Sequence, residues 1–474
     1  MIAAIIIANL ILSFYPILRI DLTKDKIHSI SAASQGIVKG LDDLVRIKVF
    51  MTKDLPPEIK PIATDLKTIL DGLVRINRNK LQVEYFDPNK DEKAKSEAEK
   101  LGIRALQFSS IKSDKFEVQN GYFGLALIYG DKQEILPVAG DVGNLEYFVV
   151  SGIKKLTAKK IPAVAVAEEQ VTPGSSEIQL LSKYLERDYQ ISEAVLDGES
   201  KLPEAETLLI VGRSKKIDDK GINKIKEWIK QKKGLIALID KVNVDNSMAA
   251  KLNENTGLED IFKQYGIEIE PKLVMDQSSG FASFRSQSGA FLTQYVYWPQ
   301  IRPENINNSL PAMSGISSLM LAWASPMKLS GEAKAMFSSS ERSVTDDSLT
   351  DLSPTTKRST DQVAGKQVIG AINSQEAKLA VIADADFIKD QFVSNNQQNL
   401  AVVLNLVDYF SQDSSLLTIR SKNLRNNPLI PLSEGMKTAV KAINLGLPII
   451  ILVITVAISN LLRKRRNQKW YERN

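Results

Sequence analysis

Four aspartates stand where predicted strands end, and their placement could support carboxylate chemistry. Asp384 and Asp386 close the apolar run that begins at 379, and Asp240 and Asp276 close two other apolar runs. The carboxyl ends of parallel strands meet at one edge of a sheet, where such folds bind ligands. Carboxylates that converge there could hold a cation or a sugar hydroxyl. The alternative is that they cap helices and accept turn hydrogen bonds, which aspartates at such positions often do.

Aromatic side chains form a second candidate group, within the irregular stretch 277–330. Tyr297 and Trp298, together with Tyr295 and Trp323, could stack on a glycan or could form a small core of their own. The sequence favours the core interpretation. The candidate ligand-binding residues are therefore Asp240, Asp276, Asp384, Asp386, Tyr297 and Trp298.

The composition excludes several kinds of chemistry. The 474 residues include 0 Cys and 1 His, which leaves no disulfide, no thiolate site and almost no material for histidine catalysis. That histidine, His28, is predicted to be an exposed or interfacial side chain. There is no Gly-x-x-x-x-Gly-Lys-Ser/Thr, Gly-x-Gly-x-x-Gly or His-Glu-x-x-His motif. No catalytic residue, cofactor or metal is predicted, and any ATP hydrolysis must come from a partner.

The charge balance bears on the class of partner. The net charge of +5 is small, and part of it belongs to the basic residues at the end of the chain. No basic patch with interleaved aromatic residues is present, so nucleic acid is not an expected partner.

Two apolar stretches are predicted to be transmembrane helices. Residues 443–462 would span about 30 Å as a helix, and the basic tail 463–474 behind them is typical of the cytoplasmic side. A buried core helix is the alternative. Residues 1–18 form the other span, with an uncleaved anchor favoured over a cleaved leader because no basic residue precedes it. Both termini would then be cytoplasmic, with the bulk of the chain outside the bacterial inner membrane.

A first α/β domain is predicted at 44–158, after a juxtamembrane linker at 19–43 in which Ser29 or Ser31 caps a short helix. Its predicted strands are 45–51, 81–86, 106–111 and 122–129, and its helices are 58–75, 91–101 and 145–156. This order of elements is typical of a thioredoxin-like domain. Lys53, Asp54, Leu55 and Pro56 occupy the position of the redox pair, so the domain is not expected to be a redox enzyme.

A second α/β domain is predicted at 159–430. Apolar strands at 161–166, 207–211, 235–240 and 379–386 alternate with helices, which predicts a doubly wound parallel sheet. Residues 338–361 are nearly all Ser, Thr, Asp and Lys, and are predicted to be a flexible loop. A linker at 431–442 leads into the second span.

Several short segments carry a family resemblance through their order and spacing. They are 22–31, 47–56, 83–88, 121–124, 145–147, 153–156 and 381–387, followed by the terminal span with its Arg-rich end. In these segments the chain resembles the membrane-anchored auxiliary components of ABC transporters of the gliding-motility type. The second domain is similar to the class I glutamine amidotransferase-like sheet. That enzyme family needs a nucleophilic cysteine, so its activity does not carry over to a chain with 0 Cys.

The resemblance implies a non-enzymatic extracytoplasmic subunit beside a separate multi-span permease and a cytoplasmic ATPase subunit, with a homo- or hetero-dimer left open. Two alternatives remain. An anchored receptor for a glycan or lipid would use an aromatic-floored groove. A carboxylate-based hydrolase would need two carboxylates converging in a cleft, one of them with a raised pKa.

Overall fold

The computed structural model describes residues 29–56, 59–112, 115–136, 145–158, 160–169, 176–245, 247–286, 289–349, 351–354, 356, 365–394, 396–411, 419, 438 and 441. The chain forms two compact units, 1–425 and 426–474, and all the helices and strands named for the chain lie in the first. Among the described residues, no helix combines the length and apolar character that crossing a bilayer requires. The two predicted spans, 1–18 and 443–462, and His28 lie outside the described residues.

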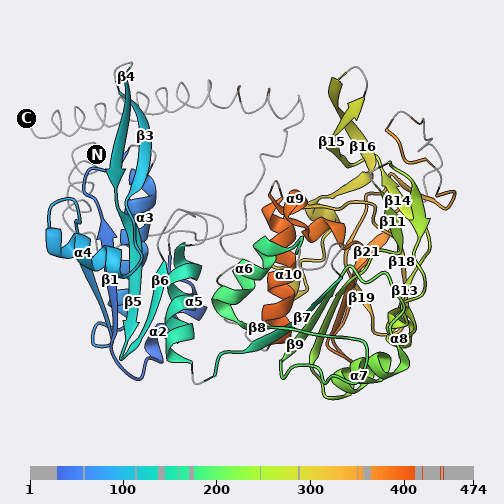
Figure 1. Ribbon diagram of the computed structural model, residues 1–474, viewed down its shortest axis with the longest axis horizontal. Coiled ribbons are helices and arrows are strands. Elements are labelled where there is room, and N and C mark those ends of the chain that lie inside the picture. Colours follow the sequence, from blue (N-terminus) through green and yellow to red (C-terminus); the bar gives the residue numbers. More distant parts are fainter. Residues whose placement is uncertain are drawn as a thin grey trace, which may run out of the picture. The chain divides into compact units, whose positions relative to one another are not determined.

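The first domain is a small mixed sheet with helices (Figure 1). Its elements are α2 (Ala32–Lys39), β1 (Val45–Met51), α3 (Lys60–Ile76), β2 (Leu81–Phe86), α4 (Glu92–Lys100), β3 (Leu106–Lys112), β4 (Lys115–Gly121), β5 (Phe123–Tyr129), β6 (Lys132–Leu136) and α5 (Leu145–Thr157). The sheet order is β2-β1-β5-β6, with β1 and β2 parallel and the other pairs antiparallel. Strands β3 and β4 form a separate hairpin, of which β4 was not predicted.

The local sequence explains these elements. The Ser31 side chain accepts a hydrogen bond from the Ser34 amide and caps α2, which confirms the predicted cap. Leu66, Leu70 and Leu73 recur at helical spacing and form the buried face of α3. They pack in one core with β1, β5 and α5. The predicted strands and helices of this domain are confirmed to within a few residues at their ends.

The second domain is built on a larger sheet. Its main elements are β7 (Ala163–Glu168), α6 (Gln179–Asp188), β8 (Gln190–Glu193), β9 (Thr207–Val211), α7 (Asp219–Lys230), β10 (Gly234–Leu238), α8 (Leu258–Gln264), β13 (Ile267–Ile269), β18 (Met327–Leu329), β19 (Lys334–Ser338), β21 (Val368–Asn373), β22 (Leu379–Ile382) and α10 (Gln397–Phe410). The order is β13-β18-β21-β22-β10-β9-β7-β8. Strands β8, β7, β9, β10 and β22 are parallel, and β21, β18 and β13 continue the sheet antiparallel.

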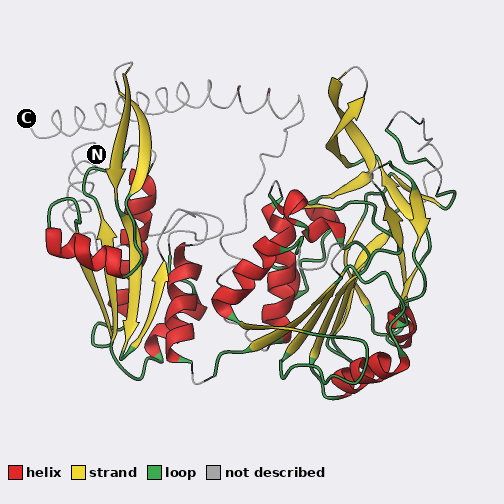
Figure 2. Cartoon of the chain, in the orientation of Figure 1, coloured by secondary structure: helices red, strands yellow, loops and turns green. Residues whose placement is uncertain are grey.

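Both faces of this sheet are covered by helices (Figure 2). In β9, Leu209 and Val211 join the core that contains α6 and α10, whereas Leu208 and Ile210 join the core that contains α7 and α8. A strand buried on both faces has no polar alternation, which is why the apolar runs could be recognised in the sequence. The predicted parallel α/β sheet is confirmed, and its antiparallel half was not predicted.

The remaining elements lie between β10 and β22 in the chain, or directly after β22. They are β11 (Val242–Val244), β12 (Ala250–Leu252), β14 (Leu273–Asp276), β15 (Ser279–Ser286), β16 (Gly289–Ile301), η2 (Pro303–Asn305), η3 (Pro311–Met313), β17 (Leu319–Met320), β20 (Ser343–Asp346), η4 (Asp386–Ile388) and α9 (Asp390–Val393). The prediction that 277–330 lacks regular structure is wrong, because β15 and β16 form a long hairpin there.

The prediction that 338–361 is a flexible loop is also partly wrong. Within it, β20 pairs with β14, and the buried hydroxyls of Ser339 and Ser343 lie 2.7 Å apart. Ser343 also donates to the carbonyl of Gly365. Composition suggested disorder because the segment is polar, but these polar groups satisfy one another and can therefore be buried.

Candidate functional site

The carboxyl edge of the parallel strands is where this fold predicts a ligand site. The chain passes from β7 to β8 on one side and then to β9 on the other, so the strand order reverses at β7. In open α/β sheets, ligands bind at such a switch point, outside the carboxyl ends of the strands. Glu168 ends β7 and Glu169 follows it, and Gly212, Arg213 and Ser214 follow β9. These residues were not predicted from the sequence, because strand order cannot be read from periodicity.

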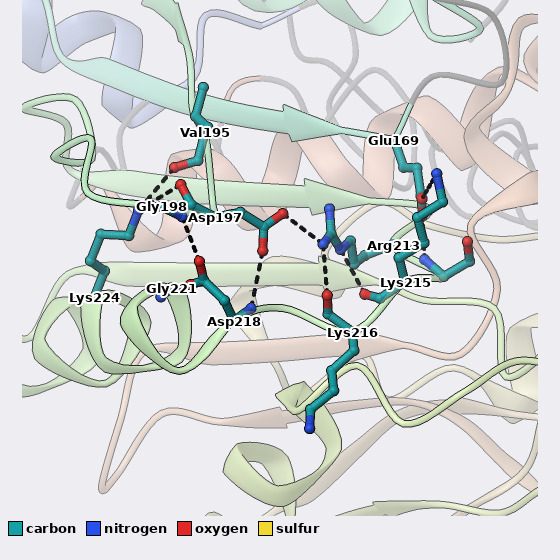
Figure 3. Close-up of polar contacts among 11 residues, drawn as sticks. Glu169, Val195, Asp197, Gly198, Arg213, Lys215, Lys216, Asp218, Gly221 and Lys224 are labelled. Carbon is teal, nitrogen blue, oxygen red and sulfur yellow. Dashed lines mark hydrogen bonds and ion pairs between the residues drawn. The ribbon is translucent and has the colours of Figure 1, made fainter.

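At the switch point, the acidic side chains are occupied by neighbouring protein groups (Figure 3). The Glu169 carboxylate accepts a hydrogen bond from the Ser214 amide and lies 3.8 Å from Lys215 Nζ. The Glu168 carboxylate accepts from the Glu177 amide at 2.9 Å. These contacts tie the segment after β7 to the segment after β9 and to the start of α6.

Arg213 has an equally structural role. Its guanidinium lies 2.8 Å from the Asp197 carboxylate and donates to the carbonyls of Lys215 and Lys216 at 2.8 and 3.1 Å. The other Asp197 oxygen accepts from the Asp218 amide. Arginine offers several donors in a fixed planar fork, which suits this arrangement. Figure 3 shows the guanidinium directed at Asp197 and the Lys216 carbonyl.

Asp218 completes this network as the cap of α7. Its carboxylate accepts from the amides of Gly198 and Gly221, both at 2.7 Å, and these hydrogen bonds lower its pKa. Lys224 donates to three carbonyls of the segment that leads from β8 toward β9. The polar groups of Figure 3 therefore hold loops in place.

Three of the four predicted aspartates do converge, at the ends of β10 and β22. The Asp240 carboxylate accepts from the Ala385 amide at 2.5 Å and also from the Asp386 amide. Asp384 is fully buried, and its two oxygens accept from the amides of Ala322 and Phe387 at 2.6 and 2.9 Å. Asp384 accepts from an amide three residues ahead, as the turn-and-cap interpretation expects, whereas Asp240 accepts from amides of the distant segment after β22.

The environments of Asp240 and Asp384 favour the protonated forms of these two carboxyls. Burial, and then the charge of Asp386, raises the pKa of Asp240 to about 7. Burial also raises the pKa of Asp384 well above its ordinary value, with Asp240 and Asp386 adding to the effect. Two buried carboxyls close together cannot both ionise easily. A raised pKa is the property that the hydrolase alternative requires, although both Asp384 oxygens are already taken by backbone amides.

A lysine compensates the negative charge at this edge. Lys389 Nζ lies 2.8 Å from both Asp386 and Glu177. Burial lowers the pKa of Lys389, but the two carboxylates outweigh this effect and raise the pKa above its ordinary value. The next residue, Asp390, accepts from the amides of Gln179 and Leu180 at the start of α6. The segment after β22 is thereby fixed over the carboxyl edge.

The other candidates lie elsewhere. Asp276 is fully buried at the end of β14, where it accepts from the Ser278 amide and from the amide and hydroxyl of Ser340. It is a turn acceptor, and no described contact joins it to the other three aspartates. The Tyr297 hydroxyl donates to Asp346 at 2.5 Å, and its ring is 1% exposed. The six candidates therefore do not form one site.

The aromatic residues form a core. Tyr295 and Tyr297 are buried, and Trp298 and Trp323 pack against them. Trp298 meets Trp323 edge-on at 5.8 Å between ring centres and meets Phe392 of α9 at 5.1 Å. The core interpretation is confirmed for these rings. They do not form an open stacking floor for a sugar.

Two further observations define what the described residues can do. They contain no group of three or more His, Asp or Glu residues arranged to hold a metal ion. A cavity of about 470 Å³ lies away from the carboxyl edge, among β5, β6, α5 and α6. Its lining is Leu125, Glu134, Ile135, Leu136, Leu145, Phe148, Val149, Leu180, Lys183, Tyr184 and Arg187, which includes none of the six candidates.

Comparison with known proteins assigns the second domain to a family. A family model described as an ABC-type uncharacterized transport system matches residues 149–410, which is more than half of the chain. A domain of unknown function matches residues 24–128. An uncharacterized protein of Borreliella burgdorferi is 21% identical over 484 aligned positions, covering 96% of this chain and 94% of its own length.

Solved structures with a similar arrangement are distant. The N-terminal domain of mmIFT52 is 11% identical with a TM-score of 0.38, covering 52% of this chain and 97% of that structure. A glutamine amidotransferase from Thermotoga maritima is 9% identical with a TM-score of 0.28, covering 55% of this chain and 96% of that structure. Scores this low carry no argument about activity.

Proposed function

The chain belongs to the family described as an ABC-type uncharacterized transport system, and from this premise we propose that it is a non-enzymatic auxiliary subunit of such a system. It works beside a separate multi-span permease and a cytoplasmic ATPase subunit. The observation that carries the proposal is the family match over 149–410, together with the lack of a phosphate-binding loop of its own. A transport subunit without an ATP site needs partners that have one.

The state of the carboxyl edge supports a non-enzymatic role. At the switch point, Arg213 holds Asp197 and Glu169 holds the amide of Ser214. At the neighbouring strands, both oxygens of Asp384 accept backbone hydrogen bonds. Groups already used in this way are not available to a substrate.

Membrane attachment is part of the proposal. The apolar sequences 1–18 and 443–462 serve as anchors, and the basic tail 463–474 lies in the cytoplasm. The bulk of the chain is then extracytoplasmic.

The first domain is a thioredoxin-like module without a redox pair, which is supported by the succession β1, α3, β2, α4, β5, β6 and α5. Among ABC systems, the gliding-motility type is the one whose auxiliary components the sequence resembles.

The subunit acts mechanically in this proposal. Movement of an ATP-driven permease would be transmitted through the anchors into the two α/β domains. Contacts between α5 and α6 could carry that movement from one domain to the next. The buried Tyr147 hydroxyl donates to Asp188 at 2.6 Å, and the Arg187 guanidinium lies 4.4 Å from the centre of the Phe148 ring.

Co-purification tests this function directly. The full-length tagged chain is extracted from native membranes in mild detergent, and co-purifying proteins are quantified by mass spectrometry against an untagged strain. We expect a multi-span permease and an ATPase in stoichiometric amounts. A matched variant carrying Leu452→Lys in the middle of the predicted anchor is expected to lose both partners, because a charge there opposes insertion. A full-length chain that emerges alone would contradict the proposal.

A carboxylate-based hydrolase is the second candidate, because burial raises the pKa of Asp240 to about 7 beside Asp384 and Asp386. A general acid or base needs a pKa near the working pH. Replacing the carboxylates separates this candidate from the first. The receptor alternative is not supported by the aromatic residues, which form a core.

A further inference from the structure

The hairpin of β15 and β16 carries an unusual concentration of exposed apolar side chains. Six large hydrophobic side chains are exposed in the described part of the chain, and three of them lie on this hairpin. Phe281 is 65% exposed, Leu292 is 67% exposed and Phe291 is 37% exposed. Figure 1 shows the hairpin extending away from the sheet of the second domain.

Strand register separates the two faces of the hairpin. Phe281 lies opposite Gln294, and Ser283 lies opposite Leu292, so these four residues share one face. All four are exposed. The other face carries Phe284, whose ring packs against Tyr295 of the neighbouring core at 5.1 Å. One face is therefore used by the domain itself, and the face of Phe281, Ser283, Leu292 and Gln294, here called the outer face, is not.

The edge of the hairpin is open as well. In the described chain, β15 pairs only with β16, and β16 pairs with β17 only near its end. An edge strand presents unpaired backbone groups, and proteins usually protect such edges with charges, prolines or short strands. Here β15 is eight residues long, contains no proline and has one charged residue, Arg285.

The near absence of charged residues on this hairpin indicates which partner could cover its surface. Charged residues make up 25% of the chain, yet Arg285 is the only one among residues 279–301. Two identical copies of an uncharged surface do not repel each other, and an interface across a two-fold axis is by definition self-complementary. A lipid surface fits less well, because the sequence joining the two strands, from Arg285 to Gly289, is polar.

We propose that the outer face of the β15–β16 hairpin, centred on Ser283 and flanked by Phe281 and Leu292, is a contact between two copies of this chain. The two outer faces pack against each other and remove the exposed side chains of Phe281 and Leu292 from water. The contact involves few side chains of each copy, whereas a standard interface buries roughly 800 Å² per partner, so the contact is weak in solution. Confinement of both copies to one membrane would raise their effective concentration.

The natural absence of cysteine permits a sharp test. The full-length Ser283→Cys chain contains a single thiol against a background of 0 Cys. Mild oxidation of native membranes is expected to give a disulfide-linked species of twice the chain mass, containing both tags when two differently tagged copies are co-expressed. The matched control is Ser200→Cys, an exposed serine outside the hairpin, which is expected to remain monomeric.

Substitutions of the outer face complete the test. In the Ser283→Cys background, adding Phe281→Ser and Leu292→Ser is expected to reduce the cross-linked fraction by about tenfold, since partial burial of these side chains is worth about 1.4 kcal/mol. Leu252→Ser, at a site that is 45% exposed on another strand, is the control and is expected to leave cross-linking unchanged. These sites are exposed, so the fold is expected to survive.

The proposal is overturned if Ser283→Cys gives no dimer, if Ser200→Cys gives one as readily, or if the thiol links to a different protein. Loss of the permease in co-purification would leave this result unaffected, so the two proposals fail independently.

Discussion

The hydroxyl of Tyr147 in α5 donates a hydrogen bond of 2.6 Å to the carboxylate of Asp188 in α6. The same carboxylate oxygen lies 3.1 Å from the guanidinium of Arg187, which in turn lies over the Tyr147 and Phe148 rings. Tyr147 and Asp188 are 1% and 8% exposed. The last helix of the first domain and the first helix of the second are therefore joined by a buried polar contact.

Tyr147→Phe is expected to destabilise the protein by about 1–3 kcal/mol, because it removes a donor from a buried carboxylate while leaving the ring in place. Thermal unfolding followed by circular dichroism in detergent measures the change. Tyr184→Phe is the control, since the Tyr184 ring contacts Arg187 at a longer centroid distance of 5.6 Å and is not buried to the same degree. Equal melting temperatures for Tyr147→Phe and the wild type would contradict this account.

Asp240→Asn is expected to stabilise the protein at alkaline pH. The folded pKa of Asp240 is about 7, above its ordinary value of 3.8, so folding favours the protonated form. This group's contribution to stability is fully present below pH 3.8 and is lost as the pH rises through 7. Asparagine cannot ionise and can still accept from the Ala385 amide. The gain is expected to be close to zero below about pH 3.8, to grow as the pH rises from about 4 to 7, and to be about 2–3 kcal/mol larger near pH 8.5 than near pH 5.

Asp245→Asn provides a control of opposite sign. Hydrogen bonds from the Ser247 hydroxyl, then from the amides of Ala249 and Ser247, lower the pKa of Asp245. Its contribution is present above its ordinary pKa of 3.8 and is lost only as the pH falls through the lower folded value. The difference between this variant and the wild type should therefore be constant between about pH 5 and 8.5. A similar alkaline gain in both variants would rule out the explanation given for Asp240.

The sequence predicted those features that depend on local pattern. Residues 207–211 were predicted as a buried strand because they lack polar alternation, and β9 is buried at every position. Ser31 was one of two predicted caps, with Ser29, because a serine side chain can reach the amide of a residue three positions ahead, and Ser31 is the cap. Neither inference required knowledge of the rest of the chain.

Features that depend on distant residues were not predicted. Ser340 lies far from Asp276 in sequence, yet its hydroxyl and amide bind that carboxylate and help to order a segment that looked flexible. Asp276 was grouped with Asp240 because both end apolar runs, but β14 belongs to a different sheet. The aspartates at β10 and β22 did converge, because those strands are parallel neighbours. Which strands are neighbours is decided by tertiary packing.

Arg213→Lys is expected to destabilise the protein by about 1–2 kcal/mol although the charge is kept. The guanidinium serves Asp197 and the carbonyls of Lys215 and Lys216 at once, and an ammonium group cannot match that planar arrangement. Lys220→Ala breaks the ion pair with Glu199, whose partners are 63% and 83% exposed, and is expected to have no measurable effect. Chemical denaturation of the two variants side by side provides the comparison, and equal midpoints would contradict a structural role for Arg213.

The double variant Asp240→Asn, Asp386→Asn decides between a coupling subunit and a carboxylate-based hydrolase. A hydrolase that uses this cluster would lose at least about a hundredfold in rate when its acid and base are replaced, since each contributes that much or more. A mechanical subunit needs only a folded edge, and asparagine preserves the acceptor that Asp240 offers to the Ala385 amide. We therefore expect the ATP hydrolysis rate of the co-purified complex to remain within about twofold of the wild type, a change of well under 1 kcal/mol.

The matched variant is Asp384→Ala, which leaves the buried amides of Ala322 and Phe387 without an acceptor and should lower the melting temperature. A fully folded double variant that keeps its partners, but in whose complex ATP hydrolysis is abolished, would favour a chemical role for these carboxylates and hence the hydrolase.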